Sequence, residues 1–154
     1  MGSMSCKPQV AIVYASVTGN TELLANRIAH ELKAAADVTL ADISSFPAES
    51  VTRYDAVLIG TYSWGEGEIP NAMLNLYDTF ESADCRSLVT AVFGTGDSFY
   101  PNYCGAVNAF RDMLFVHTEL AATLKVELAP QAEDRVRCRK LAQSVLNRLT
   151  AIAE

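Results

Sequence analysis

Short apolar runs alternate with segments of helical periodicity along most of the chain, and this alternation constrains the fold more than any other feature. The predicted strands are Val10–Tyr14, Val38–Ala41, Ala56–Gly60, Leu88–Phe93 and Ala122–Leu128. The predicted helices are Asn20–Ala35, Asn71–Phe80, Cys104–Phe115 and a last segment from about Glu133. Apolar strands separated by helices predict an α/β fold with a doubly wound parallel sheet and helices on both faces.

The size and charge of the chain narrow its class. It has 154 residues, of which 50% are hydrophobic, and a formal net charge of −6. No apolar run approaches the roughly 18 residues that a membrane helix needs, so we expect no membrane association. Residues 1–4 resemble an expression-tag remnant, which leaves one expected domain over residues 5–154. The excess of acids argues against nucleic-acid binding, which requires Lys and Arg.

The cysteines predict neither a disulfide framework nor a zinc site. Cys6, Cys85, Cys104 and Cys138 are far apart in the sequence and form no Cys-x-x-Cys pair. Free thiols fit a reducing compartment, and no leader precedes the first strand. We therefore expect a cytoplasmic protein without a metal ion.

Ligands of a doubly wound sheet bind beyond the carboxyl ends of its strands, which directs attention to the loops after Tyr14, Gly60 and Phe93. The first, loop one (Ala15–Thr21), holds several hydroxyls, an amide and Gly19, but no Lys or Arg. A single hydroxyl would suffice to cap the following helix. The surplus predicts a phosphate site that uses the N–H groups at the helix start. The spacing matches neither the nucleotide-hydrolase motif nor the dinucleotide motif.

The other two loops are aromatic and rich in glycine. Loop two (Thr61–Pro70) holds Trp64, the only tryptophan in the chain. A tryptophan there covers a flat ligand or a partner surface, or else anchors the loop on the core. Loop three (Gly94–Gly105) holds three aromatic residues, and Pro101 favours an extended Tyr100. The three loops together predict a slot for a planar heterocycle that carries one phosphate.

These loops resemble those of short-chain flavodoxins. Ser16-x-Thr18-Gly19-Asn20-Thr21 is similar to that family's phosphate loop, and Thr61-Tyr-Ser-Trp64-Gly65 to the loop over one flavin face. Gly94–Gly105 is similar to the loop over the other face. The resemblance extends from Val10 to the C-terminus and implies five parallel strands in the order 2-1-3-4-5, with non-covalently bound FMN. It is weaker at Tyr62, at Glu66 and over residues 117–128.

The resemblance implies FMN-binding residues in all three loops and no catalytic residue. In loop one they are Ser16, Val17, Thr18, Gly19, Asn20 and Thr21, around the phosphate. In loop two they are Thr61, Tyr62, Ser63, Trp64, Gly65, Glu66 and Gly67, with Trp64 over one flavin face, the Gly65 carbonyl near flavin N5 and Ser63 assisting at the phosphate. In loop three they are Gly94, Thr95, Gly96, Asp97, Tyr100, Asn102, Tyr103 and Cys104, with Tyr100 stacked on the other face and Cys104 acting through its backbone.

The function that the resemblance implies is electron transfer by a monomer. FMN would carry one electron at a time, at low potential, from a flavin- or pyridine-nucleotide-linked reductase to an acceptor such as a cytochrome P450. Two alternatives share the fold: an FMN-dependent quinone or azo reductase, and a flavoprotein that activates one partner enzyme. Residues 61–110 hold six acids and one base, a net charge of −5, so we expect an acidic loop end that docks basic partners.

Overall fold

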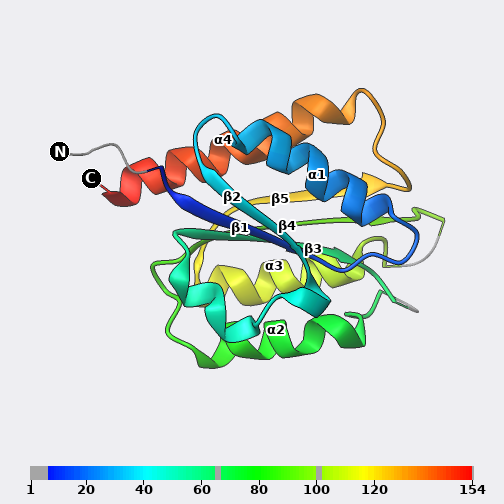
Figure 1. The fold of residues 1–154 in the computed structure, drawn as a ribbon. Helices are drawn as coiled ribbons and strands as arrows, with labels where there is room; N and C mark the ends of the chain where they lie inside the picture. Colours follow the sequence, from blue (N-terminus) through cyan, green and yellow to red (C-terminus); the bar gives the residue numbers. More distant parts are fainter. Residues whose placement is uncertain (1–6, 65–66, 100–101, 154) are drawn as a thin grey trace.

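The computed structural model describes residues 7–64, 67–99 and 102–153 (Figure 1). Its five parallel strands form one sheet in the order β2-β1-β3-β4-β5, which confirms the predicted fold class and strand order. The strands are β1 (Gln9–Tyr14), β2 (Asp37–Asp42), β3 (Ala56–Tyr62), β4 (Val89–Gly96) and β5 (Glu119–Glu127).

Four α-helices cover the two faces of the sheet. They are α1 (Asn20–Leu32), α2 (Asn71–Ser82), α3 (Gly105–His117) and α4 (Asp134–Ala153). Helices α1 and α4 pack on one face, and α2 and α3 on the other (Figure 1). In β1, Val10 and Ile12 join the core under α1 and α4, whereas Ala11 and Val13 join the core on the opposite side. Both faces of the strand are buried, which is why its sequence is continuously apolar.

The sequence misplaced several element boundaries. Helix α1 ends at Leu32 rather than at Ala35, and the 3₁₀ segments Ile43–Ser45 and Ala48–Arg53 were not predicted because they are too short for a periodic pattern. Strand β5 begins at Glu119, three residues earlier than expected. Its pairing shifts there, since Thr90 lies opposite Leu120 but Ala91 lies opposite Ala122. This bulge interrupts the alternation of side chains that would have marked the start of the strand.

The strand register places the three loops side by side. Tyr14 pairs with Gly60, and Tyr62 pairs with Thr95, so β1, β3 and β4 end along one edge of the sheet. Strands β3 and β4 run two and three residues beyond their predicted ends because this parallel pairing continues past the apolar core. Among the described helices, none has both the length and the apolar character needed to cross a bilayer.

Candidate functional site

Loop one leaves β1 and turns directly into α1. The Ala15 N–H donates to the Gly60 carbonyl at 3.0 Å, which ties the start of the loop to β3. Gly19 has φ +93°, a left-handed conformation that favours glycine, and it precedes the first residue of α1. The Ser16 hydroxyl oxygen accepts the N–H groups of Gly19 at 3.1 Å and Glu22 at 3.3 Å. One hydroxyl of this loop therefore caps the helix.

The remaining N–H groups of loop one could hold an anion. Within the described residues, the backbone N–H groups of Val17, Thr18, Asn20 and Thr21 have no hydrogen-bond partner. They surround the N-terminus of α1, where the helix dipole favours negative charge. The side chains of Val17 and Thr18 are exposed. This arrangement could hold a phosphate group through backbone donors without a cation; the phosphate site stays a prediction.

Thr21 connects loop one to loop three. Its hydroxyl lies 2.9 Å from the hydroxyl of Thr95 at the end of β4, and both residues are buried. A buried hydroxyl pair of this kind satisfies both polar groups and fixes the distance between the two loops. Of the two threonines in the predicted phosphate loop, Thr18 faces solvent and Thr21 bonds to the neighbouring strand.

Loop two forms a small hairpin around Trp64. The Trp64 and Glu68 backbones exchange two hydrogen bonds of 2.7 Å, and the Gly67 N–H donates to the Trp64 carbonyl at 3.0 Å. Gly65 and Glu66, both predicted FMN-binding residues, are outside the described residues. Trp64 is 62% exposed, so it does not anchor the loop on the core. The ring remains available to cover a flat ligand.

The start of loop two belongs to the interior more than the sequence suggested. Thr61 is fully buried, and its hydroxyl donates to the Tyr62 carbonyl at 2.8 Å. Tyr62 packs against the core under α2 and α3. The Ser63 hydroxyl accepts the Ala106 N–H at 3.0 Å and caps α3. Sequence reasoning missed this capping contact, because the two residues are 43 positions apart.

Loops two and three touch through their glycines. A Cβ on Gly105 would lie 2.5 Å from the Gly67 carbonyl oxygen, and a Cβ on Gly67 would lie 2.7 Å from Asn102 Cβ. Two non-glycine residues of loop three, Asn102 with φ 61° and Cys104 with φ 52°, adopt the left-handed conformation. Strained backbone of this kind concentrates at ligand sites. Tyr100, the predicted stacking residue, and Pro101 are outside the described residues.

Cys104 and Tyr103 form the inner wall of loop three. Cys104 is 1% exposed, and a Cβ on Gly96 would lie 2.9 Å from its sulfur. Burial raises the pKa of the Cys104 thiol above its ordinary value. The pKa of Tyr103 is raised to about 12, mainly by burial and, as the second cause, by the contact with Cys104. A buried, protonated thiol is a poor nucleophile, which agrees with the structural role expected for this cysteine.

The outer part of loop three is exposed. The Asp97 carboxylate accepts the Phe99 N–H at 2.9 Å, and the Phe99 ring is 92% exposed. In the part of the chain that the structure describes, His, Cys, Asp and Glu form no group of three or more that could hold a metal ion. The three loops therefore offer backbone donors for a phosphate and exposed aromatic residues for a ring. These groups suit the binding of a ligand that has both a phosphate and a flat ring.

Only some of the acids in the interval 61–110 lie at the loop end of the described structure. Helix α2 runs from loop two back towards the other end of the sheet, so its last turn and Asp84 lie far from the loops. Asp84 lines a groove at that opposite end. Glu68 and Asp97 are in the loops, whereas Glu66 is outside the described residues. Further acids reach this end from other segments, namely Glu22, Asp42, Glu127 and Glu133, which lie beside the carboxyl ends of β1, β2 and β5 and at the start of α4.

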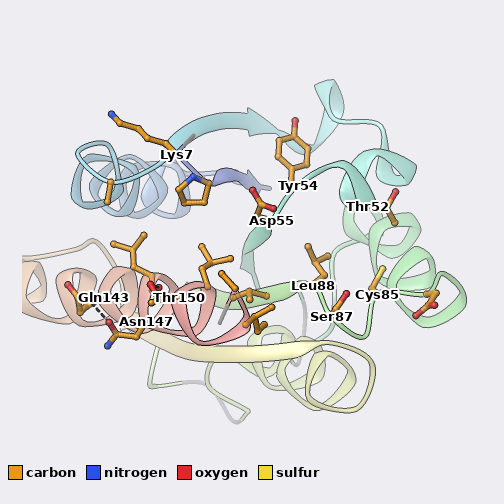
Figure 2. Close-up of a pocket in the computed structure, with 18 residues that line it drawn as sticks. Lys7, Thr52, Tyr54, Asp55, Cys85, Ser87, Leu88, Gln143, Asn147 and Thr150 are labelled. Atoms are coloured by element: carbon orange, nitrogen blue, oxygen red, sulfur yellow. Dashed lines mark hydrogen bonds between the residues drawn. The ribbon is translucent and has the colours of Figure 1, made fainter. Parts of the chain in front are cut away.

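The groove that Asp84 lines is a cavity at the amino ends of the strands (Figure 2). It has a volume of about 940 Å³, and Lys7, Tyr54 and Asp55 line one side of it while Thr150 of α4 lines another. None of its lining residues belongs to loops one to three. Ligands of a doubly wound sheet bind at the opposite, carboxyl edge. The groove is therefore separate from the candidate site.

Comparisons with known proteins agree on one family. The flavodoxin family model matches residues 12–138. The chain is similar to Probable flavodoxin 1 of Bacillus subtilis, with 40% identity over 142 residues that cover 88% of each chain. It is similar to the crystal structure of oxidised flavodoxin 1 from Bacillus cereus, with a TM-score of 0.83, 33% identity, and coverage of 90% and 97%. A short-chain flavodoxin associated with a bacterial microcompartment superimposes with a TM-score of 0.87 at 29% identity, covering 92% of this chain and 99% of that one.

Proposed function

Because the chain belongs to the flavodoxin family, we propose that it carries single electrons at low potential between a reductase and an acceptor enzyme such as a cytochrome P450. Members of this family bind FMN and transfer electrons. The protein is accordingly an FMN-binding electron carrier, not an enzyme with a substrate of its own. The reductase, the acceptor and the one-electron step are the parts that we propose.

The residues that we assign to FMN divide into a phosphate group and a ring group. The unpartnered N–H groups of loop one, those of Val17, Thr18, Asn20 and Thr21, would hold the phosphate. Trp64 and Tyr100 would cover the two ring faces, and the backbone of loop three would meet the ring edge. Bound FMN supplies the redox chemistry. The protein's part is to hold the ring, limit the access of water to it and present one edge to partners.

Loop two is where we place the redox-dependent contact. The Gly67 N–H donates to the carbonyl of Trp64, three positions earlier in the chain, whereas Gly65 and Glu66 lie outside the described residues. Glycine adopts backbone angles that other residues avoid, so the Gly65 carbonyl is the group that we expect to face flavin N5. A contact made in only one redox state would separate the potentials of the two electrons, since a tenfold difference in affinity corresponds to about 59 mV for one electron.

The unpartnered N–H groups of loop one, at the same edge of the sheet as the exposed Trp64, are the observation that carries this proposal. Visible spectroscopy tests it. The purified protein is reduced stepwise with dithionite without oxygen. We expect a yellow protein that turns blue and then loses its colour, as for a carrier that stops at one electron. Bleaching in one step would contradict single-electron transfer. A protein that stays colourless after FMN is added would contradict the FMN site.

Two further assays separate the carrier from proteins of the same fold. Fast oxidation of NADH or NADPH without an added reductase would indicate a quinone or azo reductase. If the protein with bound FMN fails to reduce cytochrome c, this would indicate a flavoprotein that activates one partner enzyme. We propose that the protein works in the cytoplasm as a monomer and docks basic partners at its acidic loop end.

A further inference from the structure

Loop three is held from outside by the last residue of β5. Ser98 donates both its N–H, at 3.3 Å, and its hydroxyl to the same carboxylate oxygen of Glu127. The Ser98 residue lies between Asp97 and Phe99, whose own hydrogen bond shapes the outer part of the loop. A carboxylate that accepts two donors from one residue restrains that residue more than a single neutral hydrogen bond does.

The backbone beyond Glu127 is attached to the same loop. The Leu128 N–H donates to the Gly96 carbonyl at 2.7 Å, immediately before Asp97. Leu128 has φ +55°, which is unfavourable for a branched side chain, and this residue is 53% exposed. The chain therefore turns sharply after Glu127 while it remains bonded to loop three. The strain at Leu128 is consistent with a position that the surrounding contacts determine.

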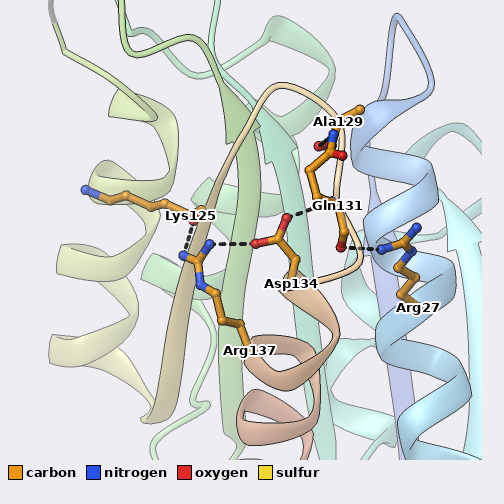
Figure 3. Close-up of polar contacts among 6 residues, drawn as sticks. All are labelled: Arg27, Lys125, Ala129, Gln131, Asp134 and Arg137. Carbon is orange, nitrogen blue, oxygen red and sulfur yellow. Dashed lines mark hydrogen bonds and ion pairs between the residues drawn. The ribbon is translucent and has the colours of Figure 1, made fainter.

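A polar network holds the base of this attachment in place (Figure 3). Arg137 of α4 donates to the Lys125 carbonyl of β5 and, at 3.0 Å, to the Asp134 carboxylate. The other oxygen of Asp134 accepts the Gln131 N–H at 2.8 Å, and the Gln131 carbonyl accepts the Arg27 guanidinium at 2.9 Å. The connection between β5 and α4 is thus bonded to β5, α4 and α1 together. These bonds hold the end of β5, where Glu127 is located, in a fixed position.

From these contacts we infer that Glu127 is a positioning residue for FMN: it holds Ser98, and with it the outer part of loop three, in the conformation that receives the flavin. This inference rests on the proposed function. Glu127 is not one of the predicted FMN-binding residues, and it does not lie in loops one to three. Without it, loop three keeps its inner wall at Cys104 but loses its outer restraint, and FMN binding must then order the loop.

The test compares four single variants, and one double variant that combines Ser98→Ala with Glu127→Ala, in the apoprotein and with FMN. Glu127→Ala removes the acceptor, Glu127→Gln keeps an oxygen acceptor without the charge, and Ser98→Ala removes one donor. Glu133→Gln is the matched control, because it removes a charge near the same end of the sheet, and the hydrogen bonds of Ser98 in the described structure go to Glu127 and not to Glu133. FMN affinity is measured by quenching of flavin fluorescence, protection of the Ser98 amide by hydrogen exchange, and apoprotein stability by urea unfolding.

We expect Glu127→Ala to weaken FMN binding roughly three- to tenfold and to lower Ser98 amide protection, with little change in the urea midpoint. Glu127→Gln should stay within about twofold of the parent, as should Glu133→Gln. Ser98→Ala combined with Glu127→Ala should cost less than the sum of the two single changes.

Three results would overturn the inference: unchanged affinity in Glu127→Ala, an equal loss in Glu133→Gln, or a lower urea midpoint that accounts for the whole effect. Failure of the parent protein to bind FMN would instead contradict the proposed function. The Ser98 exchange measurement in the apoprotein separates these cases, because it reports on the contact with Glu127 without FMN.

Discussion

At the scale of single residues, burial decides how the side chains of loop three behave with pH. Tyr103 has its pKa raised from 10 to about 12, first by burial and then by Cys104. The folded protein therefore keeps the phenol proton above pH 10, whereas the unfolded chain loses it. The stabilisation is complete below pH 10 and is lost as the pH rises from 10 towards 12.

Tyr103→Phe tests this dependence in the apoprotein. Between pH 9 and 11, the parent should lose about 1 kcal/mol more unfolding free energy than the variant. Tyr14 and Tyr77 also have raised pKa values, mainly through burial. The Tyr103→Phe variant should therefore still lose some unfolding free energy as the pH rises. Urea unfolding at a series of pH values measures the difference. Parallel curves for the two proteins would show that Tyr103 does not titrate differently on folding.

Substitutions at two loop glycines distinguish the cost of a steric clash from the cost of backbone strain. A Cβ on Gly94 would lie 2.2 Å from the Thr61 carbonyl oxygen and 2.4 Å from Val107 Cγ2, so Gly94→Ala must displace β4 or α3. We expect a loss of about 3 kcal/mol in unfolding free energy. Gly19→Ala meets no atom within 4 Å but keeps φ at +93°, so its cost should be about 1 kcal/mol. Equal costs in urea unfolding would contradict this ranking.

At the scale of elements, α4 depends on Asp134 at its first turn. This carboxylate is 7% exposed, accepts the Gln131 N–H and pairs with Arg137 three residues later. Asp134→Ala should lower the unfolding free energy by about 1–2 kcal/mol, whereas Asp134→Asn should recover part of the loss. Arg139→Ala is the control. Its 3.6 Å contact with Glu31 involves an exposed guanidinium and should contribute less than about 0.5 kcal/mol.

Strand β5 lies at the edge of the sheet, where unpaired backbone could attract a second copy. Its bulge beside Ala91 and the half-buried Lys125 are features that discourage such pairing. We therefore expect a monomer at high concentration, measured by sedimentation velocity. A concentration-dependent dimer would contradict this. A dimer abolished by a proline in β5 would identify the edge as its interface.

At the scale of the whole molecule, charge near the loops should set the rate of partner encounter. Glu22, Asp42, Glu68, Asp97 and Glu127 lie near this end, so a basic reductase should reduce the protein more slowly as salt is added. Stopped-flow reduction at increasing ionic strength measures the effect. A rate that is constant or rises between low and moderate salt would exclude electrostatic steering. Asp78→Asn, at a position on α2 away from the loop edge, should change the rate less than Asp97→Asn does.

The alternation of strands and helices could be predicted from the sequence, as could the strand order through the family resemblance and the three loops to which we assign the ligand. These features depend on periodicity and on neighbouring residues, which one chain displays directly. Three contacts became visible only in the folded chain: the capping of α3 by Ser63, the pairing of Thr21 with Thr95 and the restraint of Ser98 by Glu127. The fold also sets which acids reach the loop end, because α2 carries Asp78 and Glu81 away from the edge at which it begins. Such contacts join residues that only the packing of distant elements brings together.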